Sequence, residues 1–232
     1  MKLLIDIGNT SAKFALAEGE EIILSERVHE PWHTLLSRLQ QSYTIERCVI
    51  SNVAAEDQSL FAALRECSIP TLLLTDSTEC ALRSIPKGYG ADRIAADLGA
   101  LAKYSGRTIL VVDAGTCITY DLIDSRGNVL SGVISPGIAL RLKAMHEHTA
   151  ALPLFEADPD TPLMGTDTRT SMMSSAIHGT RFEVEGYIRT LRSAYPDMAV
   201  CMTGGDAMLM AGDMPADTVC DPLLLFRGLN TL

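Results

Sequence analysis

Residues 109–121 read ILVVDAGTCITYD, and this stretch decides the fold. Four apolar residues predict a buried strand, and Asp113 stands at its end. The Ala-Gly-Thr sequence at 114–116 predicts a tight turn, and a second strand then closes on Asp121. A buried strand that ends in a carboxylate and a glycine turn can present an anion and backbone N–H groups to a ligand.

The stretch LLIDIGNTSAKFAL at 3–16 repeats this pattern near the N-terminus. Asp6 follows an apolar strand, a turn with Gly8 and Thr10 comes next, and a second apolar run begins at Phe14. The carboxylate can hold a metal ion, and glycine lets the main chain approach phosphate oxygens. For one copy alone, an ordinary tight hairpin is the better interpretation. Two copies about half a chain apart favour a duplicated α/β fold with a cleft between its halves.

Each half is predicted to open with three antiparallel strands and to continue with alternating helices and strands. The strand patterns of the first half lie at the N-terminus and at 11–17, 21–28, 47–53 and 71–74. Those of the second half lie at 108–113, 117–122, 129–135 and 199–203, with a long helical region at 167–195. We therefore expect two domains, at 1–106 and 107–232.

Two further segments join a loop to a predicted helix. In GADR at 90–93, Asp92 and Arg93 fall in the first turn of a helix. An acidic residue there complements the helix dipole, and the pattern alone favours that interpretation. In TGGD at 203–206, a strand ends in Gly204 and Gly205, where a nucleotide could lie against bare backbone or where the chain simply turns.

The composition argues against several classes of ligand and several cellular locations. The chain has 232 residues, of which 47% are hydrophobic, so it can bury a large core. Its formal net charge of -10 argues against non-specific binding to nucleic acid or an acidic membrane surface. We expect a cytoplasmic protein, because we find no signal peptide and no apolar run of about 20 residues. The six cysteines lack C-x-x-C spacing and are expected to be reduced, and His146 and His148 are expected at the surface.

Taken together, the two strand-Asp-Gly turns, GADR at 90–93, SGVISPG at 131–137 and TGGD at 203–206 resemble the type III pantothenate kinase family. The resemblance covers nearly the whole chain, and the motifs occur in the family's order. It implies two ribonuclease-H-like domains of the actin-like ATPase superfamily with ATP between them. It also implies phosphorylation of pantothenate by ATP, the first step of coenzyme A synthesis.

The resemblance implies a role for each matching residue. Asp6 lies near the magnesium-bound phosphates, and Asp92 is the catalytic base that takes the proton of the pantothenate hydroxyl. Asp121 helps to bind a monovalent cation, potassium or ammonium. The ATP and phosphate contacts are Gly8, Asn9, Thr10, Lys13, Gly115, Thr116, Gly204 and Gly205. The substrate contacts are Gly90, Ala91, Arg93 and Thr168, the last supplied across a dimer interface.

These residue types suit phosphoryl transfer, which needs positioned donors and cations more than covalent chemistry. For Asp92, the resemblance replaces the helix-dipole interpretation with the role of catalytic base. Thr168 could be a helix N-cap as well as a substrate contact. The chain departs from the family at 83–86, where Arg-Ser-Ile-Pro replaces Tyr-x-Asn-Pro. Ser131 and Ser175 also stand where glycines are usual.

Two other functions are compatible with the sequence: a kinase of the same fold for another small hydroxyl compound, and a non-catalytic ATP-binding regulator. A homodimer is expected because the apolar residues of the long helix exceed what it needs to cover its own domain. Those residues are Met172, Met173, Ile177, Ile188 and Leu191.

Overall fold

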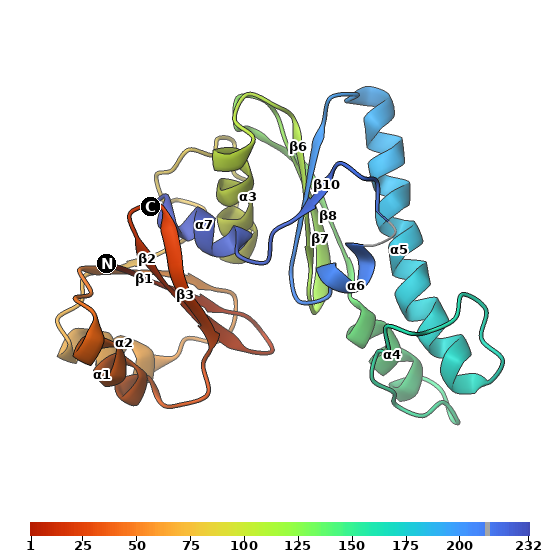
Figure 1. Cartoon of the computed structure of the whole chain (residues 1–232), viewed down its shortest axis with the longest axis horizontal. Helices are drawn as coiled ribbons and strands as arrows, with labels where there is room; N and C mark the ends of the chain where they lie inside the picture. Colours follow the sequence, from red (N-terminus) through yellow and green to blue (C-terminus); the bar gives the residue numbers. More distant parts are fainter. Residues whose placement is uncertain (212–213) are drawn as a thin grey trace. The chain divides into compact units, whose positions relative to one another are not determined.

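The computed structural model describes residues 1–211 and 214–232 and divides into two compact units (Figure 1). The first unit comprises Met1–Lys103 together with Leu223–Leu232, and the second comprises Tyr104–Pro222. The sequence pattern predicts a boundary at 106/107, with the final residues in the second domain. The structure differs there, because the last helix packs on the first unit.

The first unit is built on a five-stranded sheet in the order β3-β2-β1-β4-β5. Its first three strands form an antiparallel meander, and β4 and β5 then add in parallel beside β1. The strands are β1 (Lys2–Ile7), β2 (Ala12–Glu18), β3 (Glu21–Arg27), β4 (Arg47–Asn52) and β5 (Thr71–Leu73). The central strand β1 is apolar on both faces because helices cover both of them.

One face of this sheet packs against α1 (Trp32–Ser42) and α2 (Gln58–Glu66). The core there combines Leu3, Ile5 and Phe14 with buried residues at helical spacing on both helices. Asp57 caps α2 through the backbone N–H groups of the first turn and also accepts a bond from the Trp32 indole at 2.6 Å. This side chain therefore connects the starts of the two helices.

The opposite face is covered by α3 (Ala91–Lys103) and α7 (Leu224–Asn230). Two glycines allow these helices to touch. A Cβ on Gly99 would overlap the Leu224 carbonyl oxygen, and one on Gly228 would overlap that of Ala95. This backbone contact explains why the C-terminal helix belongs to the first unit.

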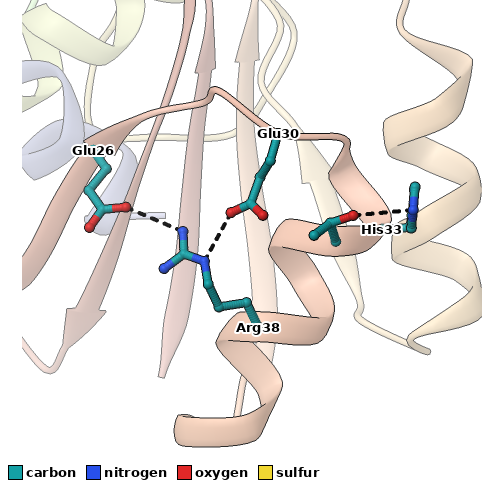
Figure 2. A network of polar contacts seen from close by, with 5 residues as sticks. Glu26, Glu30, His33 and Arg38 are labelled. Carbon is teal, nitrogen blue, oxygen red and sulfur yellow. Dashed lines mark hydrogen bonds and ion pairs between the residues drawn. The ribbon is translucent and has the colours of Figure 1, made fainter.

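A surface network joins β3 to α1 in the first unit (Figure 2). Arg38 donates from Nε to Glu30 at 2.9 Å and from a terminal nitrogen to Glu26 at 3.3 Å. His33 contacts the neighbouring Thr34 hydroxyl in the same region. All these groups reach solvent, so we expect the network to add little stability.

The second unit repeats the topology of the first, with strand order β10-β9-β6-β7-β8. Again three antiparallel strands come first, and two strands are then added in parallel beside the first of them. The strands are β6 (Ile109–Ala114), β7 (Cys117–Ile123), β8 (Val129–Pro136), β9 (Ala199–Thr203) and β10 (Thr218–Cys220). The predicted fold class, two α/β domains that each open with a three-stranded meander, is confirmed.

The helices of the second unit are α4 (Ile138–Glu147), α5 (Thr168–Ala194) and α6 (Ala207–Ala211). The C-terminal half of α5 packs on the sheet through Val184 and Ile188, and its N-terminal half packs on α4. Met172, Met173 and Ile177 are buried in that second contact. The argument that these residues are surplus was therefore wrong, since α4 and the sheet use them.

The remaining expectations concern cysteines, histidines and membranes. Within the described residues all six cysteines are free thiols, and His146 and His148 are exposed, as predicted. Among those same residues, no helix combines the length and apolarity required to cross a membrane. The short elements β10 and α7 were not predicted, because three to seven residues carry too little periodicity.

Candidate active site

Asp6 is the centre of the predicted site in the first unit. It lies at the end of β1, opposite Lys13 on β2 and Ser51 on β4. The Ser51 hydroxyl donates to Asp6 Oδ1 at 3.1 Å. The pKa of the Asp6 carboxyl is raised to about 6, mainly by burial and to a smaller extent by the charge of Asp92, although the Ser51 hydroxyl and Lys13 act in the opposite direction. This carboxylate is therefore poised to accept a cation in place of a proton.

The turn after Asp6 leaves its polar groups accessible. The Gly8 N–H donates to the Ser11 carbonyl at 3.1 Å, which closes a tight loop. Asn9 and Thr10 at the tip are exposed, and Lys13 is half-buried at the start of β2. A loop of this kind can offer side-chain and backbone donors together with one positive charge to phosphate oxygens.

Asp92 enters the same site from the start of α3. It lies in the first turn, so the helix dipole favours its negative charge. Its Oδ1 accepts the Arg93 N–H at 2.8 Å, and Gly90 leaves the space that the carboxylate occupies. A Cβ on Gly90 would lie only 2.5 Å from that oxygen. The structure thus brings Asp6 and Asp92 near enough for their charges to interact.

The two remaining substrate candidates of this segment flank the carboxylate. Ala91 is buried at the first position of α3, whereas Arg93 is half-buried. The Arg93 guanidinium lies 4.2 Å from the centre of the Tyr89 ring. The GADR segment therefore places the acidic Asp92 and the basic Arg93 at neighbouring positions in the first turn of α3.

In the second unit, the corresponding turn is held mainly by backbone packing. The Gly115 N–H donates to the Cys117 carbonyl at 3.0 Å, and Thr116 at the tip is exposed. The Gly137 N–H donates to the Thr116 carbonyl at 3.0 Å. A Cβ on Gly137 would overlap the Gly115 carbonyl oxygen. The junction between β8 and α4 thus packs directly on this loop.

Gly204 closes the loop from the side of β9. Its φ is +95°, a conformation that favours glycine, and a Cβ there would lie 2.5 Å from Asp113 Oδ1. Gly205 beside it is exposed, and the Asp206 N–H donates to the Ala114 carbonyl at 2.9 Å. The two predicted phosphate segments of this unit, around Gly115 and around Gly204, are therefore neighbours.

Asp121 and Thr168 occupy different parts of the second unit. Asp121 is 1% exposed in the middle of β7, where it pairs with Val111 and Gly132. Val111 and Asp113 are two residues apart on β6 and so point to the same face of the sheet. Because Asp121 pairs with Val111, it lies on the face that also carries Asp113. Thr168 is exposed at the first position of α5, and its suggested N-cap role was wrong because Asp167 forms the capping box.

Sequence reasoning missed Ser51 and the packing role of Gly137. Ser51 directly follows the apolar run of the strand RCVISN, one position before the strand ends. A polar residue at that register in a parallel neighbour of β1 was an available signal, because adjacent parallel strands end at one sheet edge. No local signal shows that Gly137 touches a loop twenty residues earlier.

The strand orders and these strand-end loops define the class of fold, that of the two-domain sugar kinases and actin-like ATPases. The ROK family glucokinase from Streptomyces griseus, solved with glucose and AMPPNP, matches with a TM-score of 0.54 at 11% identity. The match covers 99% of this chain and 97% of that chain, and at this identity it shows the fold alone.

The family follows from closer relatives. The family model described as type III pantothenate kinase matches residues 2–190. The type III pantothenate kinase of Bacteroides fragilis is 35% identical over 237 residues, covering 100% of this chain and 97% of the relative. That of Phocaeicola vulgatus is 33% identical over 235 residues, with coverage of 100% and 97%. The chain belongs to the type III pantothenate kinase family.

Proposed function

We propose that this chain transfers the γ-phosphoryl group of ATP to the hydroxyl of pantothenate, giving 4'-phosphopantothenate in the first step of coenzyme A synthesis. The observation that carries the proposal is the placement of two carboxylates in the first unit, Asp6 near the end of β1 and Asp92 in the first turn of α3. Phosphoryl transfer to an alcohol needs one carboxylate for a metal ion and a second for the hydroxyl proton.

Asp92 is the general base in this proposal. Its position at the start of α3 gives it a defined orientation, and Gly90 keeps the space around it open. It takes the hydroxyl proton as the oxygen of pantothenate attacks the γ-phosphorus. Arg93, Gly90, Ala91 and Thr168 are the proposed substrate contacts.

Asp6 is the proposed ligand for a magnesium ion bound with the phosphates of ATP. Asp6 suits a magnesium ion because burial makes its negative charge unfavourable. A hard cation that prefers oxygen ligands would stabilise the charged carboxylate. Magnesium would neutralise phosphate charge as the bond to the leaving group breaks. The loops with Asn9, Thr10 and Lys13, with Gly115 and Thr116, and with Gly204 and Gly205 provide donors to ATP.

A monovalent cation, potassium or ammonium, is proposed at Asp121. Support comes from the burial of this carboxylate and from its place on the sheet face that also carries Asp113. A cation there would offset negative charge near the phosphates. The test is turnover in potassium, ammonium, sodium and Tris buffers, all with magnesium. Full activity in sodium or Tris alone would remove this part of the proposal.

A homodimer with shared active sites is also proposed. Large apolar side chains are exposed on the edge strand β8 and on the helices α4 and α5. They include Ile134 at 62%, Phe182 at 58% and Leu140 at 36% exposure, which an interface between copies would bury. Mixing Asp92→Asn with Thr168→Val chains should restore activity through heterodimers with one intact pocket. A fully active monomer in sedimentation would refute the dimer.

The central experiment measures ATP turnover with pantothenate, with other small alcohols and without an acceptor. We expect turnover that depends on pantothenate. A preference for another alcohol would support a related kinase, a possibility favoured by the unusual 83–86 segment, in which Ser84 has a φ of +56°. ATP binding without turnover would indicate a regulator. With ATP as the donor, we place the enzyme in the cytoplasm.

A further inference from the structure

Asp97 is a fully buried carboxylate that the proposed mechanism does not use. It has 0% exposure in the middle of α3, between the buried residues Ala96 and Leu98. Burial of a carboxylate is costly unless polar groups satisfy it. A side chain of this kind on an otherwise apolar helix face therefore calls for a structural or functional reason.

One polar partner of Asp97 is Tyr89, which precedes α3. The Tyr89 hydroxyl donates to Asp97 Oδ2 at 2.9 Å, in a buried environment. The face of the same ring receives the Arg93 guanidinium, whose Cζ lies 4.2 Å from the ring centre. Arg93 and Asp97 are four residues apart on α3, so they lie on one side of the helix. Tyr89 connects them.

The main chain around Tyr89 is also restrained. The Tyr89 N–H donates to the Pro86 carbonyl at 3.1 Å, and the Gly88 N–H donates to Asp76 Oδ2 at 2.6 Å. Gly88 has a φ of +78°, a conformation that a side chain would oppose. Tyr89 as a whole is only 9% exposed. Tyr89 is therefore held at its backbone and at its hydroxyl, and its ring forms a fixed surface.

A fixed aromatic ring limits the conformations of an arginine side chain that packs on it. A free arginine side chain loses rotamer entropy when it is ordered, and a cation–π contact offsets part of that loss. The ring is neutral, so it restrains Arg93 without cancelling the positive charge that an anionic group of a substrate would need.

We propose that Tyr89 and Asp97 are positioning residues for Arg93, with Tyr89 as the surface that orients the guanidinium and Asp97 as the anchor of Tyr89. This inference rests on the proposed function, in which Arg93 contacts the substrate. The ligand class that fits an oriented, partly buried guanidinium is a carboxylate, and pantothenate carries one. Tyr89 acts through Arg93 and does not itself touch the substrate.

The experiment compares Michaelis constants for pantothenate and for ATP in Arg93→Ala, Tyr89→Leu and the double variant. Tyr89→Leu should raise the pantothenate constant about 3- to 30-fold, the value of a partly desolvated cation–π contact, with the ATP constant within about twofold. Arg93→Ala should raise it at least as much. The double variant should be no worse than Arg93→Ala, because Tyr89 has nothing left to orient.

Two further exchanges test the anchor. Tyr89→Phe keeps the ring but loses the hydroxyl, and Asp97→Leu removes the acceptor. Each should raise the pantothenate constant about 2- to 5-fold, and combining them should add nothing. Asp97→Asn keeps an oxygen acceptor and should stay within about twofold of the wild type. Tyr43→Leu is the matched control, since it removes a ring that packs on the other core of the same unit.

The outcomes separate this inference from the proposed function. An unchanged pantothenate constant in Arg93→Ala would refute the substrate role of Arg93 and this inference with it. A raised constant in Arg93→Ala but not in folded Tyr89→Leu would overturn the positioning role alone. Additive losses in the double variant would also overturn it, because they would show that Tyr89 acts independently of Arg93.

Discussion

The two units share a strand order, but they complete the end of their first strand in different ways. In the first unit, the carboxylate of Asp6 faces Ser51, and the charge of a second carboxylate, Asp92, reaches it from α3. In the second unit, the end of β6 is enclosed by main chain, with Gly204 against Asp113 and Gly137 against Gly115. The same topology therefore holds a cluster of charges in one unit and a tightly packed glycine loop in the other.

This difference indicates which substitutions should affect each loop most. In the first unit, chemistry depends on charge and protonation, so isosteric exchanges that alter charge should have the largest effects. In the second unit, the loop depends on close backbone approach, so an added methyl group should matter more than a change of charge.

The largest effect is expected from Asp92→Asn in the first unit. The exchange keeps the size of the side chain and removes the base, so turnover should fall about 10²–10⁴-fold while nucleotide binding changes little. Steady-state turnover and a nucleotide titration measure the two quantities. Near-normal turnover in a folded Asp92→Asn protein would show that the carboxylate is only a helix-start residue.

In the second unit, Gly137→Ala should act through volume. The new Cβ would overlap the Gly115 carbonyl oxygen, and the required shift should cost about 1–3 kcal/mol of unfolding free energy and weaken ATP binding. Urea unfolding and the ATP Michaelis constant are the measurements. Gly186→Ala on α5 is the matched control, because a Cβ there meets no atom within 4 Å and alanine favours the helix. Equal stability of wild type and Gly137→Ala would contradict close packing.

Asp6 should make the stability of the wild type depend on pH. Its folded pKa of about 6 lies above the ordinary value of 3.8, so the fold favours the protonated form. That contribution is present below 3.8 and is lost as the pH rises through 6. Between pH 4 and 7.5, the wild type should therefore lose about 1–2 kcal/mol relative to Asp6→Asn, after allowance for partial exposure.

Urea unfolding without magnesium at several pH values measures this difference. Ser51→Ala sharpens the test, because the Ser51 hydroxyl lowers the pKa of Asp6. Its removal should move the loss of stability to higher pH. A stability difference between wild type and Asp6→Asn that does not vary with pH would mean that the fold does not discriminate between the two forms of the carboxyl.

The smallest effect is expected from the surface network of Figure 2. Arg38→Ala should leave the unfolding free energy almost unchanged, because its partners are solvated and salt screens them. The comparison in the second unit is Arg141, which pairs with Glu183 and donates to Pro136 and Ser135 in a less exposed setting. Arg141→Ala should cost more. Equal unfolding free energies for the two variants would show that burial does not decide their strength.

Local sequence determined most of the secondary structure and the candidate residues. The strands β1 and β6 were predictable because strands covered on both faces read as apolar runs, and Asp6 and Asp113 interrupt those runs where the glycine turns begin. The duplication was predictable because both meanders carry the same signals. Asp92 could be located at a helix start, although its role as a base came from the resemblance of the motifs.

Only the tertiary structure decided which of these residues meet. Ser51 reaches Asp6 from 45 positions away, and Lys2 donates to the Asn230 carbonyl from 228 positions away. The helix α7 joins the first unit because Gly99 and Gly228 let two helices touch. The bond from the Tyr89 hydroxyl to the buried Asp97 likewise depends on the tertiary fold. Periodicity reports which face of an element is apolar, but it does not report what that face packs against. That choice depends on complementary shape between distant segments, which no short stretch of sequence contains.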